Sequence, residues 1–314
     1  MKTVFLFPGQ GSQKAGMLQH YSLNDPIVST IYSEAAEQTG LDLTAMDSAK
    51  QLRSTVYVQV CLLIAGVISA RRLLAKGLTP DFVAGHSAGA FAAAVIAEAI
   101  SFKQALSLIC TRATLMEQAY PRDYGMAALV GMTEAALQKF LTVFNMDHNT
   151  VYLANINAPD QLVVSGKLPS LEQLIQQLQR RGIRKAQLLD VAVPSHCPLL
   201  NSVSATLKAQ INQMELHEPV IPYASNHNGR LLRTKDAIGM DLYKSIAAPV
   251  RWYEATTLLY ELGARLFIEM EPSGVLSKIA GSTFPEAKVL SFETNDTDTI
   301  TWLGKNYQQE NQSS

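Results

Sequence analysis

The segment Gly85-His86-Ser87-Ala88-Gly89 is the clearest place in the chain for covalent chemistry. It has the G-x-S-x-G pattern of a nucleophile elbow, in which a serine lies on a sharp turn between a strand and a helix. An apolar run at 82–84 precedes it and an alanine-rich run at 91–99 follows, which predicts that strand and helix. Free N–H groups at the start of the helix stabilise negative charge. The pattern arises by chance in roughly one such chain in ten, so the alternative remains that the glycines serve only the geometry of a tight turn.

A serine hydroxyl needs a base, and His196 is the best placed of the six histidines. It lies between Pro194 and Pro198, which stiffen the loop and would hold an imidazole in position. A histidine with a structural role remains the alternative. His86 lies beside Ser87 and is expected to point away from it. The other four stand in polar surroundings and are expected to be solvated: His20, His148, His217 and His227.

Arg112 is the candidate for recognising a negatively charged substrate. It lies on a predicted helix from about Phe102 to Gln118 that is otherwise apolar around it. A guanidinium beside a buried stretch needs an acidic partner, because leaving it unpaired is costly. Two interpretations stay open: an ion pair with Glu117, or a bidentate clamp on a substrate carboxylate.

A glycine loop follows the first predicted strand, Val4–Phe7. Gly9-Gln10-Gly11 is not followed by the third glycine of a dinucleotide fingerprint, and no Gly-Lys-Ser/Thr of a P-loop occurs. The sequence therefore lacks the residues of these nucleotide-binding motifs. Loops at the carboxyl ends of parallel strands line the site in open α/β sheets, so this loop can offer N–H groups to an oxyanion.

Strands that alternate with helices predict an α/β fold with a mainly parallel sheet, here of the hydrolase-like kind. The rhythm changes between 124 and 190, where the predicted order βαββαβ is that of a ferredoxin-like unit. Its strands are expected at 126–130, 151–156, 161–165 and 185–189, and its helices at 134–144 and 171–181. We therefore expect a large catalytic domain of residues 1–123 and 191–314, with residues 124–190 inserted as a small domain.

Composition narrows the class of protein. Lys and Arg total 26 against 27 Asp and Glu, so the basic excess typical of nucleic-acid binders is missing. Three isolated cysteines, in no CxxC pair, make a poor disulfide framework and a poor zinc site and fit a reducing compartment. The N-terminal apolar run ends at Pro8, too short for a signal peptide, and the apolar stretch 91–100 is too short to span a bilayer. We expect a cytoplasmic protein without membrane, nucleic acid, bound metal or bound cofactor.

Read together, these residues resemble the malonyl-CoA:acyl-carrier-protein transacylase family over nearly the whole chain. The motifs that carry the resemblance are Phe7 to Gln13, Gly85 to Gly89, Arg112 with Met116, the group Asn155, Asn157, Pro159 and Gln161, then Pro194 to Cys197, and Pro249 to Trp252. Their agreement in this order strengthens the elbow and the His196 base well beyond what each motif gives alone.

The resemblance implies a role for each matching position. Ser87 would be the nucleophile and His196 its base. The other implied residues are the backbone N–H groups of Gln10 and Ala88 as oxyanion hole, Arg112 for the malonate carboxylate, Gln59 lining the pocket, with Ser195 and Met116 as further substrate-binding residues, and the Ser245 carbonyl to orient His196. Two positions depart from the family pattern: Val60 follows Gln59 where proline is common, and Ser245 stands where relatives carry Asn or Gln.

A third departure concerns the pathway. Ala90-Phe91 follows the elbow where many relatives have Glu, and with Tyr124-Gly125-Met126 it looks most like the epsilon subunit of malonate decarboxylase. That resemblance implies a carrier subunit whose thiol belongs to a phosphoribosyl-dephospho-coenzyme A group. The alternative is the malonyltransferase of fatty-acid or polyketide synthesis.

The implied reaction is a ping-pong transfer through a malonyl-serine ester. Malonyl-CoA would be the donor, and the prosthetic thiol of an acyl carrier protein the acceptor. A serine thioesterase or other hydrolase would share the elbow and the base, but it has no obvious use for Arg112. A non-catalytic docking protein of the same fold would be expected to have lost Ser87 or His196, and both are present.

Overall fold

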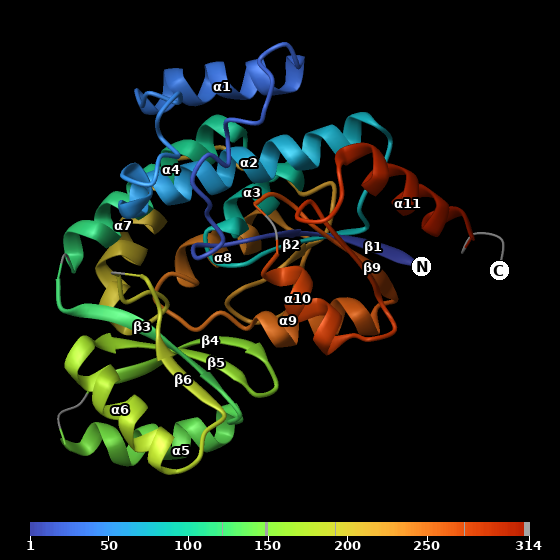
Figure 1. The fold of residues 1–314 in the computed structure, drawn as a ribbon. Coiled ribbons are helices and arrows are strands. Elements are labelled where there is room, and N and C mark those ends of the chain that lie inside the picture. Colours follow the sequence, from blue (N-terminus) through green and yellow to red (C-terminus); the bar gives the residue numbers. More distant parts are fainter. Residues whose placement is uncertain (121, 148–149, 192, 273, 311–314) are drawn as a thin grey trace.

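Two β-sheets organise the chain, shown in Figure 1. The computed structural model describes residues 1–120, 122–147, 150–191, 193–272 and 274–310. The large sheet has the order β10-β9-β1-β2-β7-β8, parallel throughout except for the β7–β8 pair. Its strands are β1 Lys2–Phe7, β2 Phe82–Gly85, β7 Tyr223–Ala224, β8 Leu231–Leu232, β9 Ala264–Glu269 and β10 Lys288–Ser291. The predicted α/β fold with a mainly parallel sheet is confirmed.

Helices cover both faces of this sheet, because successive strand residues point to opposite faces and β1 and β2 are apolar at successive positions. On β1, Phe5 and Phe7 pack toward α2 and α3, whereas Val4 and Leu6 pack toward α9 and α10. The helices outside the small sheet's segment are α1 Pro26–Thr39, α2 Thr55–Ala75, α3 Gly89–Ile96, α4 Phe102–Ala119, α7 Asn201–Ile211, α8 Lys235–Lys244, α9 Trp252–Glu261, α10 Leu276–Thr283 and α11 Thr297–Glu310, with 3₁₀ turns at Gln51–Arg53 and Pro198–Leu200.

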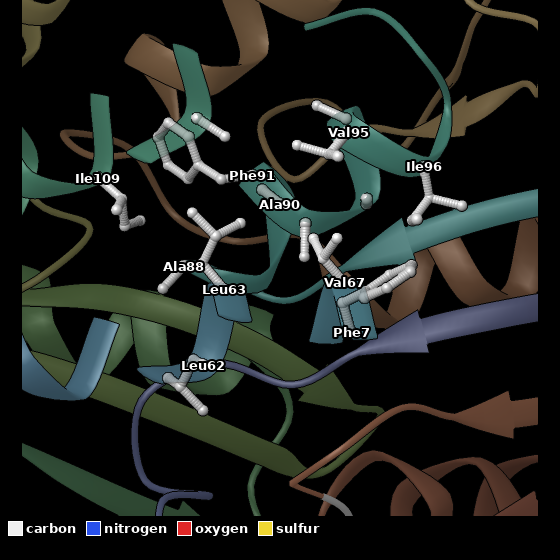
Figure 2. Close-up of a cluster of buried hydrophobic side chains, with 14 of the residues drawn as sticks. Phe7, Leu62, Leu63, Val67, Ala88, Ala90, Phe91, Val95, Ile96 and Ile109 are labelled. Carbon is white, nitrogen blue, oxygen red and sulfur yellow. The ribbon is translucent and has the colours of Figure 1, made fainter. Parts of the chain in front are cut away.

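The main hydrophobic core lies behind the turn that joins β2 to α3. Every residue of α3 is buried, and Figure 2 shows Ala90 and Phe91 of this helix among Phe7, Leu63 and Val67. Close packing on all sides of α3 keeps its first turn in one position. The residues of the turn before α3 are therefore held in a fixed position.

Helix α2 is a longer apolar segment than the run at 91–100. By length and composition alone it could cross a membrane, but 78% of its most apolar stretch is buried inside the protein. Its composition is that of a core helix, since α2 packs against both α3 and α4.

The small sheet is antiparallel, with the order β4-β5-β3-β6. Its elements are β3 Tyr124–Val130, α5 Glu134–Phe144, a 3₁₀ turn at Asn145–Asp147, β4 Val151–Ala158, β5 Gln161–Lys167, α6 Leu168–Arg180 and β6 Lys185–Leu188. The predicted order βαββαβ is confirmed. Helices α5 and α6 cover one face of the sheet (Figure 1), and Met126 and Val163 lie on the opposite face, toward the large sheet.

A short bridge joins the two sheets. The Ile156 N–H donates to the Val250 carbonyl at 2.9 Å, and the Val250 N–H donates to the Ala154 carbonyl at 2.9 Å. These two bonds make a parallel bridge between β4 and the segment just before α9. The bridge fixes the small sheet next to the carboxyl ends of β1 and β2, and a cavity lies between them.

Candidate active site

Ser87 lies on the sharp turn between β2 and α3. Its φ is 55°, in the left-handed region, which costs a residue other than glycine on the order of 1–3 kcal/mol. A Cβ at Gly85 would overlap the Gly89 backbone, and a Cβ at Gly89 would overlap the Phe7 carbonyl. Both glycines are therefore required for the close approach of backbone to backbone. The predicted strand, turn and helix of the elbow are confirmed.

His196 is in hydrogen-bond contact with this serine. Its Nε2 lies 2.7 Å from Ser87 Oγ, and its Nδ1 lies 2.5 Å from the Ser245 carbonyl oxygen. A carbonyl only accepts, so Nδ1 carries the proton and Nε2 is free to accept the one from Ser87. Burial, with the nearby Arg112 cation, lowers the pKa of His196 to about 3. The imidazole is therefore neutral, as a base must be, at physiological pH.

Two backbone N–H groups beside the serine have no partner. In the described part of the chain, no group accepts a hydrogen bond from the N–H of Gln10 or Ala88. Gln10 lines the cavity, and Ala88 is the residue before α3, where helix N–H groups are unpaired. The pair can donate to an oxyanion that forms at a carbonyl attacked by Ser87.

Arg112 lies in the cavity with only 2% of its surface exposed. Its guanidinium donates from Nη1 to Gln59 Oε1 at 2.5 Å and from Nη2 to Ser87 Oγ at 3.2 Å. Its Nε is buried without a partner among the residues that the structure describes. Glu117 accepts from Ser54 instead, at 3.1 Å, and none of the described carboxylates pairs with Arg112. Burial lowers its pKa to about 10, so it stays charged at neutral pH.

The cavity holds about 250 Å³. Ser87, Arg112 and His196 line it together with other polar residues such as Asn155 and Gln161, and apolar side chains line two of its sides. One wall comes from the small sheet and the segment after it, and the other from the start of α10. The wall residues are Met126, Ala128, Val163, Leu189, Val191, Val275, Leu276 and Ile279.

Three further predicted binding residues take different positions. Ser195 lines the cavity, and its carbonyl accepts from Ser165 Oγ at 2.6 Å. Gln59 and Met116 are not among the lining residues. Gln59 stands behind Arg112 and holds its guanidinium, and its Nε2 lies 3.9 Å from Met116 Sδ. The expectation that Gln59 lines the pocket is therefore corrected: it supports the residue that does.

Sequence reasoning missed the polar residues behind the elbow. Asn226 Oδ1 accepts from the Ser87 N–H at 2.9 Å, and its Nδ2 donates to the Gly85 carbonyl at 2.7 Å. Asp241 in turn accepts from the Asn226 N–H at 3.2 Å. The available signal was the polar run from Ser225 to Asn228 directly after β7, because β7 ends at the same edge of the sheet as β2.

The start of α10 was missed in the same way. Glu269 is fully buried, and its carboxylate accepts from four consecutive backbone N–H groups at 2.8–3.2 Å, those of Gly274, Val275, Leu276 and Ser277. These are the unpaired donors of a helix N-terminus. The carboxylate thereby fixes one apolar wall of the cavity.

The other histidines do not share the role of His196. His86 lines the cavity, but its Nε2 is 3.0 Å from Asn157 Oδ1 and 3.5 Å from Asn155 Nδ2, and burial lowers its pKa. His217 is exposed as expected. His20 is paired with Glu271, which raises the pKa of the imidazole, and His227 is half-buried with no partner for Nδ1, so neither is simply solvated. His148 lies outside the described residues.

Metal binding finds no support in these side chains: in the ranges that the structure describes, no three His, Cys, Asp or Glu residues gather at one point.

Comparison with known proteins gives a consistent result. Residues 4–313 match the acyl transferase domain family. The chain is 32% identical to the malonyl CoA-acyl carrier protein transacylase of Bacillus subtilis strain 168, over 99% of this chain and 98% of that one. The solved transacylase from Coxiella burnetii is 31% identical, with a TM-score of 0.91 over 97% of each chain.

A third relative was solved together with its partner. It is a malonyl transacylase in complex with the holo acyl carrier protein of a type II polyketide synthase. It is 28% identical to this chain, with a TM-score of 0.90 over 96% of this chain and 99% of that one. The α/β fold with a mainly parallel sheet and a second, antiparallel sheet is shared with these solved proteins.

Proposed function

Because the chain belongs to the acyl transferase domain family and is an acyltransferase, we propose that it transfers a malonyl group from coenzyme A to the thiol of an acyl carrier protein. The observation that carries the proposal is the position of Ser87 Oγ. It lies 2.7 Å from a neutral imidazole and 3.2 Å from a buried guanidinium without an acidic partner. The hydrogen-bonded pair of serine and histidine can form an acyl ester, and the buried arginine beside it can bind a carboxylate. This combination fits an acyl group that bears its own carboxylate.

In the first half of the reaction, Ser87 attacks the thioester carbonyl of malonyl-CoA. His196 Nε2 takes the hydroxyl proton, and the N–H groups of Gln10 and Ala88 hold the oxyanion. The C–S bond then breaks, the imidazolium returns its proton to the leaving thiolate, and a malonyl-serine ester remains. The Ser245 carbonyl stabilises the imidazolium by accepting from Nδ1.

In the second half, the carrier thiol gives its proton to His196 and attacks the ester, and Ser87 leaves with the proton returned. Throughout, Arg112 holds the free carboxylate of the malonyl group and so excludes acetyl. We assign Gln59 and Met116 to the support of Arg112, and Ser195 to the cavity wall. The apolar walls would accompany the pantetheine arm of either thiol substrate.

For the pathway, we propose a carrier protein of fatty-acid or polyketide synthesis as acceptor. The relatives are named for transfer to acyl carrier protein, and one was solved with the carrier of a polyketide synthase. The role of a malonate decarboxylase epsilon subunit rests on Ala90-Phe91 and Tyr124-Gly125-Met126 alone and is the second proposal. Transfer rates to the two kinds of carrier separate them: an acyl carrier protein bearing phosphopantetheine, and a decarboxylase carrier subunit.

The domain organisation and the cellular location are further proposals. We interpret residues 124–190 as an inserted ferredoxin-like domain, because their strand order is β4-β5-β3-β6, and residues 1–123 with 191–314 as a hydrolase-like catalytic domain, because of the elbow. We further propose a cytoplasmic location, which three free cysteines at 61, 110 and 197 support.

The direct test is the intact mass of the protein after brief incubation with malonyl-CoA, beside acetyl-CoA and a Ser87→Ala control. We expect one malonyl adduct, absent from Ser87→Ala and weak with acetyl-CoA. Free coenzyme A without an adduct would indicate a hydrolase. Neither adduct nor free coenzyme A would show that the substrate class is wrong.

A further inference from the structure

The nucleophile and its base share an unusual backbone conformation and a common anchor. Ser87 and His196 have φ values of 55° and 60°, both in the left-handed region. The N–H of each is held by the segment that contains α8: Ser87 through Asn226 at 2.9 Å, and His196 through the Ile246 carbonyl at 3.0 Å. A strained conformation persists only where the surrounding structure holds it.

Asn226 holds the elbow on both sides of His86. Its amide accepts from the N–H of Ser87 with Oδ1 and donates to the carbonyl of Gly85 with Nδ2. The side chain is only 2% exposed, so water does not compete for either bond. These two hydrogen bonds fix the peptide planes around Ser87, and hence the direction of its Cα–Cβ bond.

Asp241 in turn holds Asn226 and its neighbours. Its carboxylate accepts from the N–H groups of Asn226 and His227 at 3.2 and 2.8 Å, and from the hydroxyls of Tyr223 and Ser225 at 2.8 and 2.5 Å. All four donors belong to β7, the strand paired with β2, or to the three residues directly after it. A buried carboxylate with four donors is a rigid attachment point, since losing any of them leaves a polar group unsatisfied.

The same turn of α8 also reaches the base. Asp241 lies in the last turn of α8, and its own carbonyl accepts from the Ser245 N–H at 3.0 Å. The Ser245 carbonyl then accepts from His196 Nδ1 at 2.5 Å. A single turn of helix therefore connects by hydrogen bonds to Ser87 on one side and to His196 on the other.

From this geometry we propose that Asn226 and Asp241 are positioning residues, through which the C-terminal turn of α8 sets the alignment of Ser87 with His196. Neither touches the substrate cavity; both act through the elbow. The proposal rests on the proposed function for its natural assay, but its geometry requires only a serine activated by a histidine.

The test compares Asn226→Ala and Asp241→Asn with the wild-type enzyme. Misplacing a reacting group by about 1 Å costs about 100-fold in rate, which is the loss we expect in malonyl-ester formation for Asn226→Ala. The dissociation constant of malonyl-CoA should change less than about threefold, because the binding groups are untouched. Asp241→Asn keeps the size of the side chain but loses acceptors, so a loss of about tenfold is expected.

Ser204→Ala on α7, the helix that packs against α8, is the matched control. Ser204 Oγ donates to the Tyr243 carbonyl of α8 at 2.7 Å, a bond that leads to neither Ser87 nor His196. We expect wild-type rates within about twofold at a comparable shift of melting temperature. Equal losses in Ser204→Ala and Asn226→Ala would overturn the proposal, because any loosening of α8 would then suffice.

A His196→Ala background separates positioning from general damage. Groups that act as one unit are strongly non-additive. Once the base is gone, Asn226→Ala should lower the residual rate less than about threefold; a full 100-fold loss there would contradict the proposal.

A second readout keeps this test apart from the fate of the proposed function. The rate at which a sulfonyl fluoride labels Ser87 reports the alignment of serine and histidine without any malonyl substrate. If the wild type forms no malonyl ester, the proposed function fails, yet labelling of Asn226→Ala should still be slowed about 100-fold. Labelling at the wild-type rate would overturn the positioning role by itself.

Discussion

Two buried charges stand on opposite sides of Ser87, and they are satisfied to very different degrees. Among the described residues, Arg112 on the cavity side donates to Gln59 and Ser87 only, and its Nε has no partner. Asp241 on the far side accepts four hydrogen bonds. Burial costs each ion several kcal/mol, so a complete set of partners stabilises a fold, whereas an incomplete set leaves a charge available to a ligand. The difference distinguishes a structural charge from a binding charge.

The largest effect should come from removing the satisfied charge. Asp241→Ala leaves four donors without their acceptor, and we expect the free energy of unfolding to fall by about 4 kcal/mol. Urea unfolding followed by circular dichroism measures it. The exposed Asp236 on the same helix is the control, with an expected change of about 0.5 kcal/mol or less for Asp236→Ala. Similar losses of unfolding free energy in Asp241→Ala and Asp236→Ala would show that the hydrogen bonds of Asp241 do not stabilise the fold, and its contrast with Arg112 would be wrong.

Removing the unsatisfied charge should affect transfer instead of stability. Arg112→Ala should slow formation of the malonyl ester by about 100-fold, equivalent to about 3 kcal/mol of lost charge pairing. The free energy of unfolding should stay equal or rise, because a poorly satisfied buried ion is gone. The rate with acetyl-CoA is the internal reference and should change little. A variant that unfolds readily and keeps its preference for malonyl would reverse our assignment.

A free ligand should complete the partners of Arg112. Malonate at 100 times its dissociation constant should raise the free energy of unfolding by about 2.7 kcal/mol, since it binds the folded state only. Arg112→Ala should show no such gain. Sodium chloride at equal ionic strength controls for screening. Equal stabilisation of both proteins would place the anion elsewhere.

The smallest effect is a pH dependence of stability that originates at His196. Its pKa falls from 6.5 to about 3 on folding, so the unfolded chain binds a proton that the folded one refuses. Stability from this group is complete above pH 6.5 and is lost as the pH falls toward 3. Between pH 7.5 and 5.5 we expect a loss of about 1.4 kcal/mol. His196→Gln should lack that part of the slope; an unchanged slope would show that His196 is not buried as a neutral base.

Much of the fold and of the site could be predicted from local pattern. The elbow needs small residues between a strand and a helix, and those requirements are written within a few positions around Ser87. Strand and helix periodicity likewise predicts the order of elements along residues 124–190, because amphipathic spacing is a short-range property. The contact between His196 and Ser87 is long-range, and only the resemblance to a family linked them.

The missed residues have no local pattern. Asn226 and Asp241 are separated by β8 and most of α8, and their meeting depends on how α8 packs beside β7. The resemblance to the family implies that Gln59 lines the cavity. In this chain it lies behind Arg112, where its amide oxygen accepts from the guanidinium. Which of two polar neighbours faces the cavity is a matter of side-chain packing that spacing does not encode.

The bridge between Val250 and the strand β4 bears on how this protein can be recombined. Residues 124–190 enter and leave the chain as one stretch, which invites exchange of that stretch between relatives. Yet its strand β4 is hydrogen-bonded to Val250, which lies some sixty residues beyond the end of the stretch. A chimaera that exchanged the stretch alone would place a foreign edge against Val250 and shift the wall that carries Met126 and Val163. The unit of exchange is the stretch together with the turn before α9.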